Sequence, residues 1–214
     1  MADWLRFAGD CVPTGNVAQW VPWVEGFDAN PKVAAGPPVM LSFAQCTPNP
    51  VATLTARAAI GATSLSVASA VAGAAVPDLL NAANKRLVLI DAAENAHVTL
   101  ATSSSLTIDT DPTVVGNQGL HRSYPAGTPL CRVDVLSFSV QTDPTLHVPA
   151  LMLDANDGLG AIPIADLITG FQVTTLSAGK HYELTMTATS ELPDPMTGVS
   201  LTRTLRSDVT LRNG

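Results

Sequence analysis

The hydrophobic and polar positions alternate most regularly in the last third of the chain. Between Tyr182 and Ala188 every second residue is apolar, with glutamate or threonine in between, and the same period returns between Val199 and Leu211. A two-residue period predicts strands with one buried and one wet face. The break between them, residues 192–198 (LPDPMTG), has the Pro, Asp and Gly of a hairpin connection. The pattern therefore predicts a long two-stranded ribbon.

Two polar residues interrupt the apolar face of this ribbon. Arg203 and Ser207 fall in the apolar phase of the second strand. We predict that they mark where the buried face runs out. Upstream, residues 164–170 (IADLITG) predict a short helical turn, which leads into a third strand at residues 171–173.

Three further segments predict strands of the same sheet. Residues 38–44 form an apolar run, and residues 132–140 form a long strand with residues 146–153 as its partner. The apolar phase of the long strand changes between Val135 and Leu136, which a β-bulge would explain. The expected sheet is thus antiparallel and built from residues 38–44 and 132–213.

The middle of the chain has a different pattern. Short apolar runs recur with turn residues between them, which predicts a small β-barrel-like or meander module inserted at residues 52–131. Its strands are expected near residues 53–56, 64–67, 86–91, 97–101 and 106–109. A single helical turn is possible at residues 77–80.

The first 51 residues are expected to hold little regular structure before the strand at 38–44. Residues 3–8 are compatible with the last turns of a helix, and Gly9 can cap its end. A loop follows whose aromatic residues are Trp20, Trp23 and Phe27. These side chains are expected to cover a sheet face or edge, and the alternative is a ligand platform. The domain prediction is therefore 1–51, 52–131 and 132–214.

Composition supports a β-rich class. Of the 214 residues 46% are hydrophobic, whereas 14% are charged and 5% aromatic, and the net charge is −7. No run of apolar residues is long enough to span a membrane. The 11 Lys and Arg residues are scattered. Nucleic-acid binding is therefore not expected, because it draws on clustered cations.

The chain has three cysteines, and none forms a CxxC pair. Cys131 is in phase with two valines of a strand, so we expect it to be buried. Cys11 and Cys46 lie in proline-containing loops and are the expected pair if a disulfide forms. The alternative is three reduced thiols, since pairing cannot be read from spacing.

The order of these segments resembles a known family. The run IPIADLITGFQV at residues 162–173, the following strand with outward threonines, and DPMTGVSLTRTLRSDVTLRN at residues 194–213 resemble the C-terminus of PilW-type minor pilins and J-type minor pseudopilins. The stretch LRFAG at residues 5–9 matches the end of the long N-terminal helix in that family. The resemblance is closest over residues 132–213 and looser over 38–131, where GPP at residues 36–38 replaces the usual polar strand entry.

The resemblance implies an α+β pilin-like fold and a structural role. Such proteins help to initiate or cap a type IV pilus or a type II secretion pseudopilus. The implied partners are other minor pilins, the major pilin and the inner-membrane assembly platform. The implied location is the periplasm or an extracellular filament, with a leader and a hydrophobic helix expected ahead of this sequence as the anchor. Trp4, Leu5 and Phe7 would then be interface residues.

Two other functions stay open at this stage. The pattern GATSLSV at residues 61–67 with PAGTPL at residues 125–130 also resembles modules of phage and other surface structural proteins. The chain could accordingly be a virion or surface structural protein. The third alternative is an adhesin-like or DNA-uptake pilin with a ligand face.

No motif predicts catalysis or a resident cofactor. The four histidines (His97, His121, His147 and His181) lack metal-binding spacing, and no nucleophile elbow or phosphate loop is present. The letters SAGK at residues 177–180 fit SxxK but lie in an expected loop. We therefore predict no enzyme.

The one candidate metal loop follows residue 153. Asp154, Asn156 and Asp157 could bind calcium, which some pseudopilins do. However, Gly158 takes the fifth loop position and no terminal glutamate follows, whereas Asn and Asp before Gly are typical of a tight turn. The turn is the preferred interpretation, and these three residues are the ligands if calcium binds.

Overall fold

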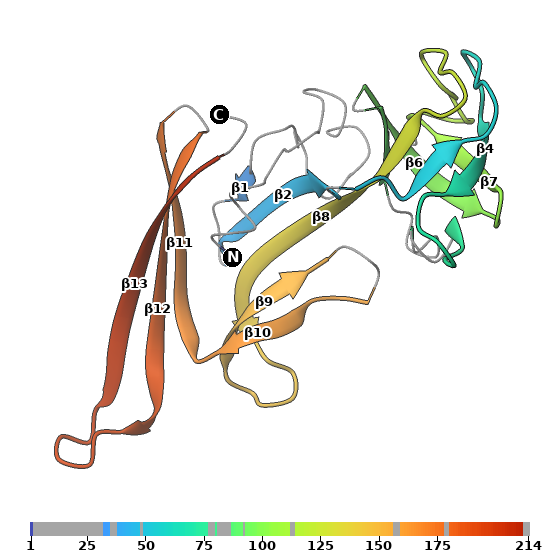
Figure 1. Ribbon diagram of the computed structural model, residues 1–214. Coiled ribbons are helices and arrows are strands. Elements are labelled where there is room, and N and C mark those ends of the chain that lie inside the picture. The colour runs from blue at the N-terminus through green and yellow to red at the C-terminus, as the bar shows by residue number, and fades with distance from the viewer. Residues whose placement is uncertain are drawn as a thin grey trace. The chain divides into compact units, whose positions relative to one another are not determined.

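The described part of the chain is built mainly from antiparallel strands (Figure 1). The computed structural model describes residues 1, 32–34, 38–47, 49–76, 80, 87–91, 93–111, 114–155, 159–177 and 180–211. The strands are β1 (Lys32–Ala34), β2 (Met40–Cys46), β3 (Ala52–Leu54), β4 (Ser64–Ser69), β5 (Leu87–Ile90), β6 (Glu94–Ala101), β7 (Ser105–Asp109), β8 (Pro129–Thr142), β9 (Pro149–Asp154), β10 (Ile162–Asp166), β11 (Ile168–Ser177), β12 (His181–Pro193) and β13 (Ser200–Thr210).

The predicted mainly β class is confirmed, but the α+β pilin-like arrangement is not supported. Among the described residues, only Val76 and Leu80 are helical. The expected helix end at residues 3–8 lies outside the described residues. The chain's fold is therefore set by strand pairing rather than by helix packing.

One sheet has ten strands and is organised on β8. Its hydrogen-bonded order is β1-β2-β8-β3-β4-β7-β6-β5, with β9 also on β8 and β10 on β9. Strand β5 also pairs with β8. The series β8-β3-β4-β7-β6-β5 therefore begins and ends on β8. The sheet as a whole is not a closed barrel, because in the described part of the chain β1 and β10 are edge strands. The meander prediction is correct for β5, β6 and β7, whereas β4 pairs across to β7.

The chain divides into two compact units. Unit 1 contains the described residues of 30–43 and 135–214, and unit 2 those of 44–134. The division passes through β2 and β8, so these two strands contribute to both units.

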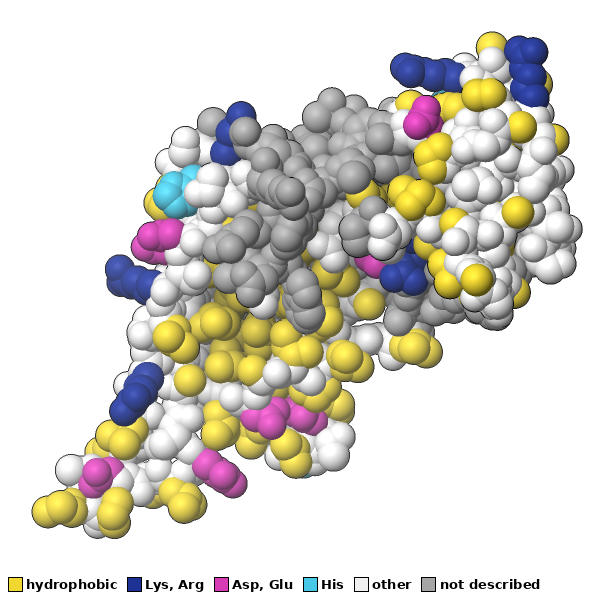
Figure 2. Space-filling view, viewed as in Figure 1, with side chains coloured by type: hydrophobic (Ala, Val, Ile, Leu, Met, Phe, Trp, Pro, Cys, Tyr) yellow, Lys and Arg dark blue, Asp and Glu magenta, His cyan; other side chains and the backbone are white. Residues whose placement is uncertain are grey.

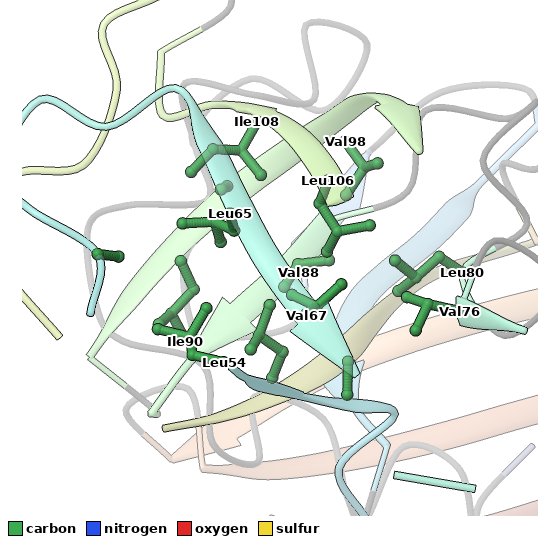
Figure 3. Close-up of a cluster of buried hydrophobic side chains, with 14 of the residues drawn as sticks. Leu54, Leu65, Val67, Val76, Leu80, Val88, Ile90, Val98, Leu106 and Ile108 are labelled. Carbon is green, nitrogen blue, oxygen red and sulfur yellow. The ribbon is translucent and has the colours of Figure 1, made fainter. Parts of the chain in front are cut away.

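Unit 2 encloses the larger apolar core (Figure 3). The alternation of β4 and β7 puts Leu65, Val67, Leu106 and Ile108 inside, all at most 3% exposed. Val88 and Ile90 of β5 and Val98 of β6 face the same cluster. Because each strand offers one apolar face to this cluster, hydrophobic burial holds the ring of strands together.

Strand β2 is buried on both faces. Leu41 and Phe43 on one face are fully buried, and Ser42 and Ala44 on the other face are only 1% exposed. The hydroxyl groups of Ser42 and Ser137 lie 2.9 Å apart, which satisfies both buried side chains. Phe43 stacks on Phe138 of β8 with ring centroids 5.8 Å apart. A continuous apolar run thus corresponded to a central strand.

The C-terminal ribbon has the predicted register. Tyr182 pairs with Val209, Leu184 with Ser207 and Ala188 with Arg203. This places Arg203 and Ser207 on the apolar face, as expected. Val209 is 1% exposed, whereas Ser207 and Arg203 are both exposed. The prediction that these two residues mark the end of the buried face is confirmed.

Two expectations upstream of the ribbon are wrong. Residues 164–170 form no helical turn, because β10 and β11 meet there at Leu167, whose φ is 61°. A left-handed residue turns the chain sharply between two strands. As a result β11 pairs with β12 instead of joining β10. The expected single sheet of residues 38–44 and 132–213 is therefore two sheets, the second being β11-β12-β13.

The hairpin between β12 and β13 has the predicted turn chemistry. The Asp194 carboxylate accepts hydrogen bonds from the backbone N–H groups of Met196 (2.8 Å) and Thr197 (3.0 Å). The hydrogen bond from Thr197, and then that from Met196, lowers the pKa of Asp194 because both favour the ionised carboxylate. Gly198 closes the turn with a φ of 70°, a conformation that glycine adopts without a steric penalty.

The core of unit 2 gives a stability prediction. Leu106→Ala should lower the free energy of unfolding of this unit by about 2–5 kcal/mol, because the side chain is fully buried and leaves a cavity. Val115→Ala is the matched control and should change it by less than about 0.5 kcal/mol, since Val115 is fully exposed. Urea unfolding followed by circular dichroism measures both. Equal effects of the two changes would contradict the assigned core.

Candidate functional site: a buried carboxylate cluster and an open ribbon

The most distinctive polar cluster in the described part of the chain surrounds Glu94. Asp91, with a φ of 49°, directly follows β5, and Glu94 is the first residue of β6. Its pairing with Ile90 directs it toward the interior of unit 2, and it is 3% exposed. A carboxylate is stable at such a position only when its oxygens are hydrogen-bonded or ion-paired.

Two hydrogen-bond donors and one imidazole nitrogen from a single loop contact this carboxylate. Oε1 accepts the backbone N–H of His121 at 2.6 Å and lies 2.9 Å from its Nδ1. Oε2 accepts the phenolic O–H of Tyr124 at 2.8 Å. Glu94 therefore fastens the loop that joins β7 to β8 onto the start of β6.

The same loop is fixed on its other side by backbone contacts. Tyr124 forms an isolated bridge with Ala58, and the N–H of Leu120 donates to the carbonyl of Ala62 at 3.0 Å. Gly119 has a φ of 65°, and a Cβ there would lie 2.4 Å from the carbonyl oxygen of Gly61. Only glycine fits this approach. The loop is thus held between Glu94 and residues 58–62.

The cluster changes the proton affinity of its phenol. Burial raises the pKa of Tyr124 above its ordinary value, and the hydrogen bond to Glu94 and the charge of Glu94 raise it further. A phenol held beside a carboxylate keeps its proton, because its anion would face a second negative charge. Tyr124 is consequently a hydrogen-bond donor to Glu94 over the whole neutral range.

This arrangement is better suited to anchoring than to chemistry. Glu94 is enclosed and already accepts hydrogen bonds from two donors, and the side chain of His121 is 67% exposed beside it. In the part of the chain that the structure describes, no three His, Cys, Asp or Glu side chains are grouped to hold a metal ion. Next to Glu94, Asn95 is fully buried, and neither of its amide atoms has a hydrogen-bond partner in the described structure.

The second notable surface is the outer half of the C-terminal sheet. On one face, threonines of β12 and β13 lie opposite each other, as in the pairs Thr187–Thr204 and Thr189–Thr202. On the other face lies an open apolar stripe, defined by Met186, Ala188, Leu201 and Leu205. Leu201 is 58% exposed and Leu205 66% exposed. Figure 2 shows hydrophobic side chains gathered at the hairpin end of the ribbon, where Leu192 and Met196 are also exposed.

The residues predicted from sequence are placed only in part. Asp154 ends β9, while Asn156 and Asp157 lie outside the described residues, so the calcium loop stays a prediction. Cys46 is half-buried at the end of β2 and Cys11 lies outside, so their disulfide also stays a prediction. The interface candidates Trp4, Leu5 and Phe7 lie outside as well.

The structure also shows where Cys131 and the SxxK sequence lie. Cys131 is half-buried rather than fully buried. Ser177 ends β11 and Lys180 precedes β12, so this SxxK sequence belongs to a connection between strands, as expected.

Sequence reasoning missed the Glu94 cluster. His121 and Tyr124 follow Glu94 by 27 and 30 residues, and the three residues belong to no recognisable motif. The only available signal was a glutamate in a hairpin turn, where a solvated side chain is the ordinary interpretation.

Comparisons with protein-family models, with curated proteins and with solved structures found no match for this chain. Within the described residues, no helix has the length and apolar character required to cross a membrane.

The anchoring role of Glu94 predicts a stability loss. Glu94→Gln should lower the free energy of unfolding of unit 2 by roughly 2–3 kcal/mol, because the new amide group donates where only donors face it. Asp111→Asn, a carboxylate-to-amide change in the same loop, is the control. Thermal and urea unfolding measure both. A Glu94→Gln protein as stable as the control would contradict the anchor.

The raised pKa of Tyr124 predicts a loss of stability in alkali. The folded state holds the phenolic proton more tightly than the unfolded chain does. The resulting stabilisation is complete below the ordinary tyrosine pKa of about 10 and is lost as pH rises from there toward the higher folded pKa. Unfolding free energies measured between pH 8 and 11 should fall more steeply for the wild type than for Tyr124→Phe. Parallel curves would show that Tyr124 does not carry this linkage.

Proposed function

We propose that the chain is a structural subunit of an extracytoplasmic filament, of the PilW-type minor pilin or J-type minor pseudopilin class. Its role would be to help initiate or cap a type IV pilus or a secretion pseudopilus, without catalysis. The resemblance of residues 132–213 to that family is the starting point. The open ribbon is the single structural observation that carries the proposal.

The ribbon supports an assembly role through its distribution of exposure. Tyr182 and Leu184 are buried at one end of the sheet, and Phe171 is buried opposite Met186. Toward the hairpin, the same face carries Leu201 and Leu205, which are exposed on either side of Arg203. Exposed apolar side chains grouped on one face of a sheet are typical of an interaction site. Complementary packing of such faces would hold the subunit in a filament.

The proposed partners follow from the family resemblance. They are other minor pilins, the major pilin and the inner-membrane assembly platform, and the proposed location is the periplasm and then the filament. The anchored arrangement of Glu94 fits a non-catalytic part, because the carboxylate stabilises a loop.

One observation favours a second candidate, a virion or surface structural protein. Unit 2 contains its own buried core, and the strand series β8-β3-β4-β7-β6-β5 begins and ends on β8. The sequence of this unit resembles modules of phage and surface proteins. A module with its own core could serve the same structural purpose in a different particle.

Deletion of the encoding gene in its source bacterium tests the proposal. We expect loss or marked reduction of surface filaments by electron microscopy, or loss of secreted substrates from the medium. A plasmid carrying the full gene should restore the phenotype, with the empty plasmid as control. Unchanged filaments and unchanged secretion, with the chain recovered from purified phage particles, would overturn the proposal in favour of the second candidate.

A further inference from the structure

We propose that two copies of this chain pair through β13 and join their three-stranded sheets into one antiparallel six-stranded sheet. The inference concerns a specific interface and does not depend on the filament function. It rests on the open edge of β13, on the direction of its backbone groups and on the match of the strand with itself.

The edge of β13 is long and accessible. The strand covers 11 residues and, in the described structure, pairs only with β12. Of these residues only Val209 is buried. A long exposed edge carries a row of hydrogen-bonding groups that can pair with another strand.

The direction of these groups can be assigned from two contacts. The N–H of Leu211 donates to the carbonyl of Lys180 at 2.9 Å, and the N–H of Leu201 donates to the Ser190 hydroxyl at 2.9 Å. Hydrogen-bonding direction alternates along an antiparallel strand. The odd-numbered residues of β13 therefore face β12. The residues whose backbone groups face outward are Ser200, Thr202, Thr204, Arg206, Asp208 and Thr210.

A two-fold axis at Leu205 uses all six of these residues. Ser200 then pairs with Thr210 of the second copy, Thr202 with Asp208, and Thr204 with Arg206. Six hydrogen-bonded pairs with two bonds each give about twelve backbone hydrogen bonds across the interface.

The same axis matches the side chains on the apolar face. Leu205 lies opposite Leu205 of the second copy, and Leu201 lies opposite Val209. Arg203 lies opposite Ser207 of the second copy, so the two open apolar stripes meet at Leu205 and this polar pair flanks the contact on both sides. An axis at Arg206 is disfavoured, because two guanidinium groups would lie directly opposite each other.

The ribbon also has a structural need for a partner. The last β11 residue paired with β12 toward the hairpin is Ile168, opposite Ala188. Beyond Ala188 only β12 and β13 continue, and an isolated two-stranded ribbon is marginally stable in water. Addition of a strand from a second copy gives the outer ribbon a third and a fourth strand.

Sedimentation velocity and light scattering test the association. The wild-type chain should show a concentration-dependent doubling of mass. Thr204→Pro removes one outward N–H and obstructs the edge without removing a bond to β12, and it should stay monomeric at the same concentrations. Thr204→Val keeps the N–H and should behave as the wild type. Both variants must retain the wild-type circular dichroism spectrum, and a wild type that remains monomeric throughout overturns the proposal.

Cysteine cross-linking tests the axis. In a background with Cys11, Cys46 and Cys131 changed to alanine, Leu205→Cys should form a disulfide-linked dimer on mild oxidation. Paired residues at non-hydrogen-bonded positions have Cα atoms about 4.5 Å apart, within the range of a disulfide. Arg203→Cys and Ser207→Cys are controls, because each would lie about 13 Å from its own copy. Linkage of either control in preference to Leu205→Cys overturns the proposed axis.

Discussion

Backbone hydrogen bonding along β8 is the constraint on which the rest of the structure depends. A buried strand must satisfy the N–H and C=O groups on both of its edges. Over residues 130–133 β8 pairs with β5 on one side, and its first two residues pair with β3 on the other. From Ser137 onward it pairs with β9. One strand of 14 residues thus supplies an edge to both units.

The exchange of partners also explains the irregular pattern of this strand. Val133 is the last residue paired with β5, and Ser137 is the first paired with β9. The apolar phase changes between them, at Val135 and Leu136. Ser137 and Ser139 are buried although they are polar, and Ser137 is accommodated by the Ser42 hydroxyl 2.9 Å away. The irregular alternation at this point reflects the change of neighbouring strand from β5 to β9.

What could be predicted from the sequence follows from the range of each interaction. The ribbon register was readable because two alternating strands lie next to each other around a turn, so local pattern and pairing agree. The strand at β2 was readable, but its second buried face was not, because Ser42 and Ala44 are covered through pairing with distant chain. The turn at Leu167 was misread because a short apolar run fits one helical turn as well as two strands meeting at a corner. The Glu94 cluster depends on a loop 27 residues away, and no local signal encodes that contact.

The Glu94 cluster and the threonine face of the C-terminal sheet are the two main polar features of the described structure, and they have different roles. In unit 2, the Glu94 carboxylate is enclosed and accepts its hydrogen bonds from His121 and Tyr124 of one loop, so these bonds hold that loop against the core. On the C-terminal sheet, the polar residues are threonines on a wet face, and the apolar residues opposite them are left uncovered. Burial of Tyr182 and Val209 fixes one end of that sheet. The outer ribbon is therefore positioned by the fold without being covered by it, which is the physical condition for a surface that completes itself against another chain.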